Sequence, residues 1–238
     1  MTARTDYAAE TDLVIANAEQ DMDGWWRSTE SMAPAARQSG FRKLMVRLTY
    51  MYGAVAADAA RAYLYREWFG YGGDFLRLPY PDLAPAISSE QVAASTDWAM
   101  QTQAGGLAVA IASEVRDRAV GVLVRAVMQQ ARDTIAENAA KAGTRFARVP
   151  EPGACAFCTM LASRGGVYLD SGNALSSDGA KWHSNCRCTA IQVRDDRELP
   201  AASHRAMQSY KEWTDEIDRS RGANVSDFQA WMYEKSKK

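Results

Sequence analysis

The stretch that decides the fold class is GLAVAIASEVRDRAVGVLVRAVMQQARDTIAENAAKAG, residues 106–143. It contains no proline and is rich in alanine, the residue that forms helix most readily. Apolar residues recur every three or four positions, which is the spacing of one face of an α-helix. The recurring positions are Ile111, Val115, Ala119, Val122, Ala126 and Ile135. Because Gly143 is a natural helix C-cap, the sequence predicts a long helix that ends there.

Two further amphipathic helices are predicted upstream. Residues 11–32 carry apolar side chains at helical spacing and an aromatic end with two tryptophans. Residues 41–70 follow the helix breaks expected at Pro34 and Gly40 and carry a single apolar stripe. The stripe consists of Leu44, Leu48, Met51, Val55, Ala59 and Tyr63. Both segments indicate long helices that pack through one face.

The remaining segments are assigned by their breakers and caps. Residues 70–85 crowd Gly and Pro together and are predicted to be a loop. Ser88 or Ser89 is the expected N-cap of a short helix that follows. Residues 144–155 read as an arginine-flanked linker with two prolines, in extended conformation. From about residue 200, alternating aromatic and charged residues predict one or two exposed amphipathic helices.

Composition narrows the class of protein. The chain has 238 residues, enough to bury a core without cross-links. It has 28 Lys and Arg against 29 Asp and Glu, so its net charge of -1 gives no global attraction to nucleic acid or anionic membrane. No apolar run reaches the roughly 18 residues of a membrane span, and the first residues lack a signal-peptide core. We therefore expect a protein without membrane partners, made in a reducing compartment.

All 4 cysteines and one of the 2 histidines lie within residues 155–188. Clustered cysteines in a reducing compartment are more often metal ligands or redox groups than disulfides. Cys155 and Cys158 have the spacing with which two thiolates grip one tetrahedral ion, and His183 and Cys186 form a second pair of similar bite. The two pairs together make a complete four-ligand shell.

Cys188 is a fifth candidate ligand. If Cys186 and Cys188 lie on an extended segment, their side chains point to the same face, so either one could complete the site. The favoured set is Cys155, Cys158, His183 and Cys186, with Cys188 as the competing ligand. Four protein ligands make a closed site, which is structural, and mixed thiolate and imidazole ligands favour zinc over iron.

Other readings of the cysteines remain open. The C-x-x-C pair could be a thioredoxin-like redox pair, or the cysteines could form disulfides. A zinc deaminase is excluded, because both histidines follow the C-x-x-C pair and Cys155 follows Ala154 rather than proline. A nucleophilic Cys with His183 as base is disfavoured by the clustering of four thiols. His204 is expected to be a solvated surface residue.

The motifs resemble those of a known family. RVPEPGACAFCTMLASRGGVYLDSG (148–172) and KWHSNCRCTAIQV (181–193) are similar to the C-terminal motif of the phage Mu protein F-like minor head proteins, particularly those of phages that infect actinobacteria. That pattern is C-x-x-C, then LASRG-x-VY, then H-x-x-C-x-C and a short apolar strand. The resemblance covers roughly residues 130–195, about a quarter of the chain.

The resemblance implies a role in head morphogenesis, inside the capsid near the portal vertex, in few copies. The five Cys and His residues match the family's Cys/His motif by position, and Arg164, Gly165 and Tyr168 match its RG-x-VY segment. In that segment Gly165 and Gly166 are expected to permit a turn with positive φ, and Tyr168 to start a strand beneath the metal. The implied partners are the portal protein, other capsid components and further copies of the chain, with non-specific contact to packaged DNA.

The sequence thus predicts three parts. Residues 1–143 form a mainly α part with long helices for portal or assembly contacts, 144–195 a small α+β zinc-binding module, and 196–238 a helical tail. The predicted function is a non-enzymatic minor capsid protein of the virion, present in the host cytoplasm during assembly. The alternative is a phage-encoded enzyme, ADP-ribosyltransferase-like or a processing factor, that carries a structural zinc.

Two surface features bear on partners. The four tryptophans Trp25, Trp26, Trp68 and Trp98 could anchor an interface, although each one singly is more often a core residue. A modest basic patch is expected around the metal, where phosphate contact is plausible but sequence-specific reading is not. The patch consists of Arg145, Arg148, Arg164, Lys181 and Arg187.

Overall fold

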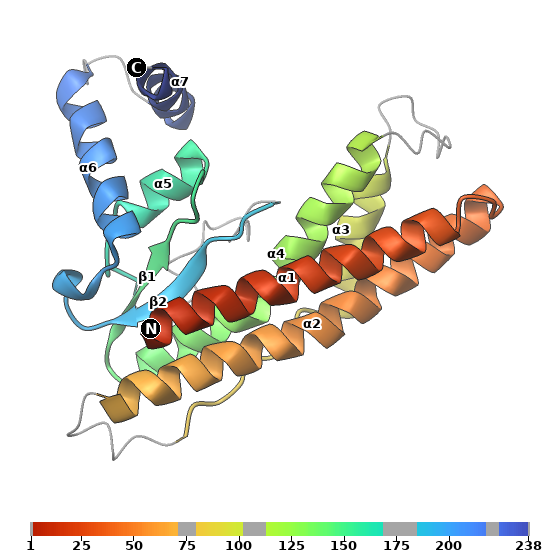
Figure 1. Ribbon diagram of the computed structural model, residues 1–238, viewed down its shortest axis with the longest axis horizontal. Coiled ribbons are helices and arrows are strands. Elements are labelled where there is room, and N and C mark those ends of the chain that lie inside the picture. Colours follow the sequence, from red (N-terminus) through yellow and green to blue (C-terminus); the bar gives the residue numbers. More distant parts are fainter. Residues whose placement is uncertain (1, 71–79, 102–112, 169–184, 218–223, 238) are drawn as a thin grey trace. The chain divides into compact units, whose positions relative to one another are not determined.

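The computed structural model describes residues 2–70, 80–101, 113–168, 185–217 and 224–237 (Figure 1). Within these ranges the chain is mainly helical, with a two-stranded sheet, as the sequence predicts. The elements are α1 (Ala3–Ser28), α2 (Pro34–Gly70), α3 (Ser89–Met100), α4 (Ser113–Lys141), β1 (Arg145–Val149), α5 (Ala156–Ala162), β2 (Thr189–Val193), α6 (Ala201–Glu216) and α7 (Val225–Ser236). Every helix in the described part is too short or too polar to cross a bilayer.

The chain divides into two compact units, each with its own core. The first comprises residues 1–135 and 175–187, and the second comprises residues 136–174 and 188–238. Helix α4 contributes residues to both. The three-part division at residues 143 and 195 stays a prediction.

Helices α1 and α2 form an antiparallel pair in the first unit, visible as the red and orange helices of Figure 1. Aromatic rings join them at both ends. Tyr7 stacks on Tyr63 with ring centroids 5.2 Å apart, and Trp25 meets Phe41 at 5.4 Å. Helix α1 begins earlier than residue 11, because Thr2 caps it in a reciprocal capping box with Thr5.

A break does precede Pro34, since α1 ends at Ser28, but the break expected at Gly40 is wrong. Pro34 is the first residue of α2, a position where its missing N–H and fixed φ are tolerated. Gly40 lies within the helix, and a Cβ there would come 3.0 Å from the Trp25 ring. This glycine therefore makes room for a neighbouring side chain instead of ending a helix.

The apolar stripe predicted on α2 is only partly buried. Leu48, Ala59 and Tyr63 are buried, whereas Met51 is 45% exposed and Val55 is 53% exposed. The buried face instead includes Met45 and Ala56 among other positions. The positions 44, 48, 51, 55 satisfy the helical period, but a period alone does not identify which apolar face meets the core.

Helices α3 and α4 agree with the prediction where they are described. Ser88 is the N-cap of α3, and its hydroxyl accepts a hydrogen bond from the Gln91 N–H. Helix α4 is buried over much of its circumference, and five of the six predicted apolar positions are buried, Ile111 lying outside the described residues. Gly143 has φ +64°, and the Thr144 N–H donates to the Ala139 carbonyl at 2.9 Å, which closes the helix end.

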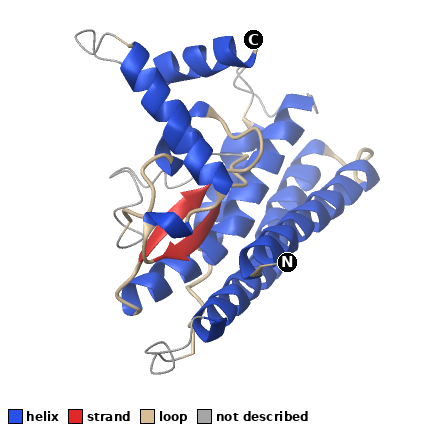
Figure 2. Ribbon diagram, turned by 60° about the vertical axis from the view of Figure 1, so that its left-hand side comes forward, coloured by secondary structure: helices blue, strands red, loops and turns tan. Residues whose placement is uncertain are grey.

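The second unit contains the sheet, drawn in red in Figure 2. Strands β1 and β2 pair antiparallel, from Arg145 opposite Val193 to Val149 opposite Thr189. Within residues 144–155, the part Arg145–Val149 is extended as expected, but it is not merely a linker. Phe146, Ala147 and Arg148 are buried, because this segment is one of the two strands of the sheet.

The C-terminal segment forms two helices, α6 and α7, as predicted. They are not simply exposed, because both pack on α5. Trp213 of α6 and Phe228 of α7 are buried in one cluster with Ala156 of α5, and Met160, Tyr210, Ile217, Trp231 and Met232 pack around it. Short helices that are marginal alone are stabilised by such packing.

Candidate metal centre

Helix α5 positions the first pair of cysteines. Gly153, with φ +78°, turns the chain after strand β1, and the helix begins immediately after Cys155. Cys155 is exposed at the N-cap position, whereas Cys158 lies one turn into the helix and is 3% exposed. The C-x-x-C pair therefore occupies the first turn of a helix and divides into one exposed and one buried thiol.

The segment that enters strand β2 carries Cys186 and Cys188. Asn185 has φ +64°, a left-handed conformation that Asn tolerates better than most residues. Its N–H donates to the carbonyl of Gly121 in α4, with an N···O distance of 3.1 Å. Cys186 and Cys188 follow and are 0% and 2% exposed. Both thiols are thus directed into the interior.

Cys158, Cys186 and Cys188 form what we call the three-thiol group. Their Sγ atoms all lie within 4.8 Å of one another, and all three residues are buried. Cys158 and Cys188 belong to the second unit. Cys186 precedes Cys188 in the sequence with a single residue, Arg187, between them. All four cysteines of the chain are thiols. The group could hold a metal ion.

The donor set fits a thiophilic metal. Tetrahedral zinc with Zn–S bonds of 2.3 Å separates its sulfurs by about 3.8 Å, so thiols within 4.8 Å need only a small contraction. Soft thiolate ligands select zinc, Cu(I) or iron–sulfur chemistry over magnesium or calcium. Three thiols leave one position of a tetrahedron for a further ligand.

Of the two other predicted ligands, the structure describes only one. Cys155 is described by the structure but is not among the three clustered thiols. His183 lies outside the described residues. Cys186 and Cys188, which the sequence treats as alternatives, are brought together in the same group. The assignment of the five residues as ligands stays a prediction.

A buried arginine hydrogen-bonds the segment that carries Cys186 and Cys188. Arg132 of α4 is 1% exposed, and its Nη2 donates to the carbonyl of Cys186 at 2.6 Å. Sequence reasoning missed this residue because Arg is rarely buried. The signal was its position, since Arg132 lies four residues after Met128 and three before Ile135, both on the buried side of the helix.

The R-G-G-V-Y segment, residues 164–168, connects α5 to the elements around it. Gly165 has φ +68°, as predicted, whereas Gly166 does not have a positive φ. The Gly166 N–H donates to Oδ1 of Asp196 at 2.9 Å. Tyr168 forms a bridge with Phe146, and the strand expected to follow it lies outside the described residues. Its hydroxyl donates to the Leu161 carbonyl at 2.8 Å. These contacts tie the end of α5 to the sheet.

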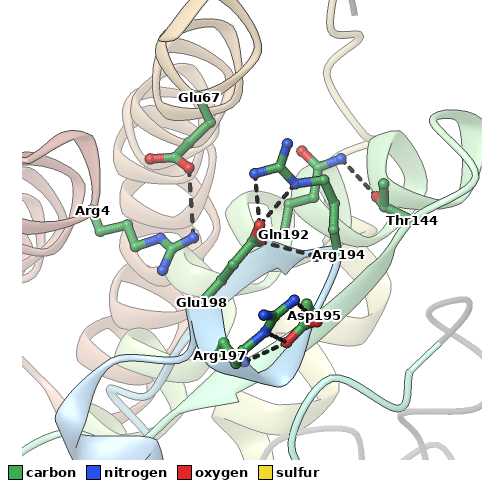
Figure 3. A network of polar contacts seen from close by, with 8 residues as sticks. All are labelled: Arg4, Glu67, Thr144, Gln192, Arg194, Asp195, Arg197 and Glu198. Atoms are coloured by element: carbon green, nitrogen blue, oxygen red, sulfur yellow. Dashed lines mark hydrogen bonds and ion pairs between the residues drawn. The ribbon is translucent and has the colours of Figure 1, made fainter. Parts of the chain in front are cut away.

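Polar pairs continue from the sheet edge into the turn that carries Asp196. Gln192 donates to the Thr144 hydroxyl at 2.6 Å, and Arg194 pairs with Glu198 at 2.6 Å (Figure 3). The Arg197 guanidinium hydrogen-bonds the Asp195 carboxyl and holds its pKa at about 2. These pairs fix the 3₁₀ turn Asp196–Glu198, which presents Asp196 to Gly166.

The predicted basic patch is not supported as a set. Arg148 is 1% exposed, its guanidinium lying 6.0 Å from the centroid of the Tyr168 ring, so it cannot contact a phosphate at the surface. Arg187 forms an ion pair with Glu19. Arg145 and Arg164 are exposed, and Lys181 lies outside the described residues. His204 is exposed on α6, as expected.

Comparison with family models shows what the chain is similar to. Residues 1–216 match the model of a family described as VG15 protein. No curated protein and no solved structure matches the chain. Since the match extends over most of the sequence, from α1 to the end of α6, the chain belongs to the VG15 family, a family of phage gene products.

Proposed function

We propose that the chain is a non-enzymatic minor head protein of a phage, acting in head morphogenesis at the portal vertex inside the capsid. The observation that carries this proposal is the match of residues 1–216 to a phage family, which supports a virion-associated protein. The resemblance of residues 148–193 to Mu F-like proteins adds the role in the head.

The proposed partners are the portal protein, other capsid components and sister copies, with non-specific contact to packaged DNA. Exposed aromatic side chains support a docking role for the first unit. Trp98 of α3 is 51% exposed, whereas Trp68 is 6% exposed and belongs to the core. Of these two, Trp98 is the candidate anchor, because tryptophan is enriched at interface hot spots.

We further propose that the three-thiol group holds a structural zinc, with Cys155 or His183 as the fourth ligand. When bound, zinc supplies a cross-link between α5 and the start of β2, through Cys158 and Cys188. Helix α5 has 7 residues, too few to persist alone, so a cross-link at Cys158 adds directly to its stability.

The head role is tested on virions and on purified proteins. Mass spectrometry of purified virions of the encoding phage should find the chain in few copies, and immobilised portal protein should retain the purified chain. Trp98→Ala should weaken retention, whereas Tyr233→Ala, which removes a 60% exposed aromatic from α7, should not. Virions that lack the chain would contradict the proposal.

The metal is tested by elemental mass spectrometry on protein purified without chelator. About one zinc per chain is expected, and Cys158→Ser and Cys188→Ser should lose it, because each removes a buried ligand. Cys155→Ser is the matched variant with an exposed thiol, and retention of zinc there assigns the fourth position to another residue. Wild-type protein without metal would refute the zinc site while leaving the head role to be judged on virions.

A further inference from the structure

The peptide that carries Cys186 is held by the first unit at three points. The Asn185 N–H donates to the Gly121 carbonyl at 3.1 Å, and Arg132 donates to the Cys186 carbonyl at 2.6 Å. The next residue, Arg187, forms an ion pair with Glu19 of α1. Helix α4 thus bonds the backbone on both sides of one candidate ligand, and α1 pairs with the side chain of the residue that follows it.

Among these contacts, that of Arg132 is the most buried. Arg132 is 1% exposed, whereas the side chains of Arg187 and Glu19 are 36% and 25% exposed. A guanidinium stays protonated in proteins, so α4 places a permanent positive charge in the interior beside the Cys186 peptide. Burying a charge is costly unless neighbouring groups compensate it.

A thiolate set at Cys158, Cys186 and Cys188 would provide compensating negative charge. Metal binding requires deprotonated thiols, and three thiolates around a divalent ion leave a net charge of about -1. The hydrogen bond to the Cys186 carbonyl also restricts the orientation of its side chain. Groups that hydrogen-bond a ligand residue without touching the metal typically change metal affinity 10- to 100-fold.

We propose that Arg132 is a positioning residue of the metal centre: it orients the Cys186 peptide and supplies the positive charge that the thiolates require. This inference rests on the proposed metal site and deepens it. It also gives a reason for a fully buried arginine in the middle of α4, where the helical pattern calls for an apolar residue.

The test is a cobalt titration of the full-length chain. Co²⁺ bound by thiolates gives a charge-transfer absorption band, and competition with a chelator gives the affinity. We expect Arg132→Met to lower the affinity 10- to 100-fold and to alter the band. Arg132→Lys keeps the charge but not the fork of donors, so it should recover part of the affinity.

Arg125→Met is the matched control. Arg125 lies two turns earlier on the same helix, is partly buried, and bonds the Ser95 hydroxyl at 2.8 Å instead of a cysteine peptide. It should bind Co²⁺ as the wild type does. Equal affinities of Arg132→Met and Arg125→Met, with both variants folded by circular dichroism, would overturn the role of Arg132.

If Arg132→Met does not fold, substitutions at Asn185 test whether the conformation of the Cys186 peptide sets the metal affinity. Asn185→Gly accepts φ +64° and should retain affinity within about two-fold, whereas Asn185→Ala strains the same peptide and should weaken binding several-fold. Equal binding by the two would overturn positioning of the Cys186 peptide by the first unit. A wild-type chain that binds no Co²⁺ would refute the metal site itself and with it this inference.

Discussion

Gly166 has no room for a side chain. A Cβ there would lie 2.4 Å from Cγ2 of Val193, and its N–H is already bonded to Asp196. Gly166→Ala should therefore destabilise the second unit by about 1–3 kcal/mol through overpacking. The measurement is urea unfolding followed by circular dichroism.

Gly24→Ala is the comparison for this substitution. Nothing lies within 4 Å of a Cβ at Gly24, which is inside helix α1. Alanine there should stabilise by about 0.5–1 kcal/mol, because glycine weakens a helix interior. The two substitutions should shift the urea midpoint in opposite directions. If both shift it by the same amount in the same direction, close packing at Gly166 does not stabilise the turn.

The Asp195 carboxyl gives a pH prediction. Hydrogen bonds from Arg197 lower its pKa to about 2, below the usual value of about 3.9. Since the folded pKa is depressed, the stabilising contribution is present above the usual pKa and is lost as the pH falls toward 2. NMR titration should show the low pKa, and Arg197→Gln should raise it toward the usual value, because the guanidinium bonds are lost while the backbone N–H bond at position 197 remains. An unchanged pKa in that variant would count against the pairing.

At the scale of elements, Phe228 is the residue that α7 buries completely. Phe228 is 0% exposed and meets Trp213 with ring centroids 5.0 Å apart. Phe228→Ala should remove about 3–5 kcal/mol of packing free energy. A helix of 12 residues is only marginally stable without such packing, so α7 should unfold. The amides of α7 should then lose protection from hydrogen exchange. Tyr233→Ala, on the exposed side, should leave protection unchanged, and a protected α7 in Phe228→Ala would show that other contacts hold it.

Helices with strong periodicity and clear caps were predictable, and the exceptions have physical causes. The start of α1 depends on the reciprocal Thr2–Thr5 bonds, which precede its apolar pattern. Pro34 and Gly40 are breakers in isolation, but one stands at a helix start and the other faces a tryptophan ring. Strand β1 resembles a linker in sequence because its five residues include two arginines, one of which, Arg148, is buried.

At the scale of the whole molecule, bound metal should appear in the thermal stability. A ligand at 100 times its dissociation constant stabilises the folded state by about 2.7 kcal/mol. Removing the metal with a chelator should then lower the melting temperature by roughly 5–10 °C. Cys158→Ser should melt low and be insensitive to the chelator. If the chelator leaves the wild-type melting temperature unchanged, the chain holds no structural metal.

The candidate site was only partly predictable. The spacing of Cys155, Cys158, Cys186 and Cys188 drew attention to the right segment, because metal-ligand pairs follow local geometry. Spacing does not show burial, which separates Cys155 from the other three. Nor does it show contacts made over 54 positions of sequence, such as that between Arg132 and Cys186.

The exposed thiol of Cys155 is a site at which the protein can be labelled and then located inside a particle. A maleimide reagent should reach this thiol in the folded chain, whereas Cys158, Cys186 and Cys188 are shielded. A gold cluster or fluorophore attached at one defined point would let individual copies be counted and located in electron micrographs of heads. Slower labelling in the presence of zinc would identify Cys155 itself as the fourth ligand.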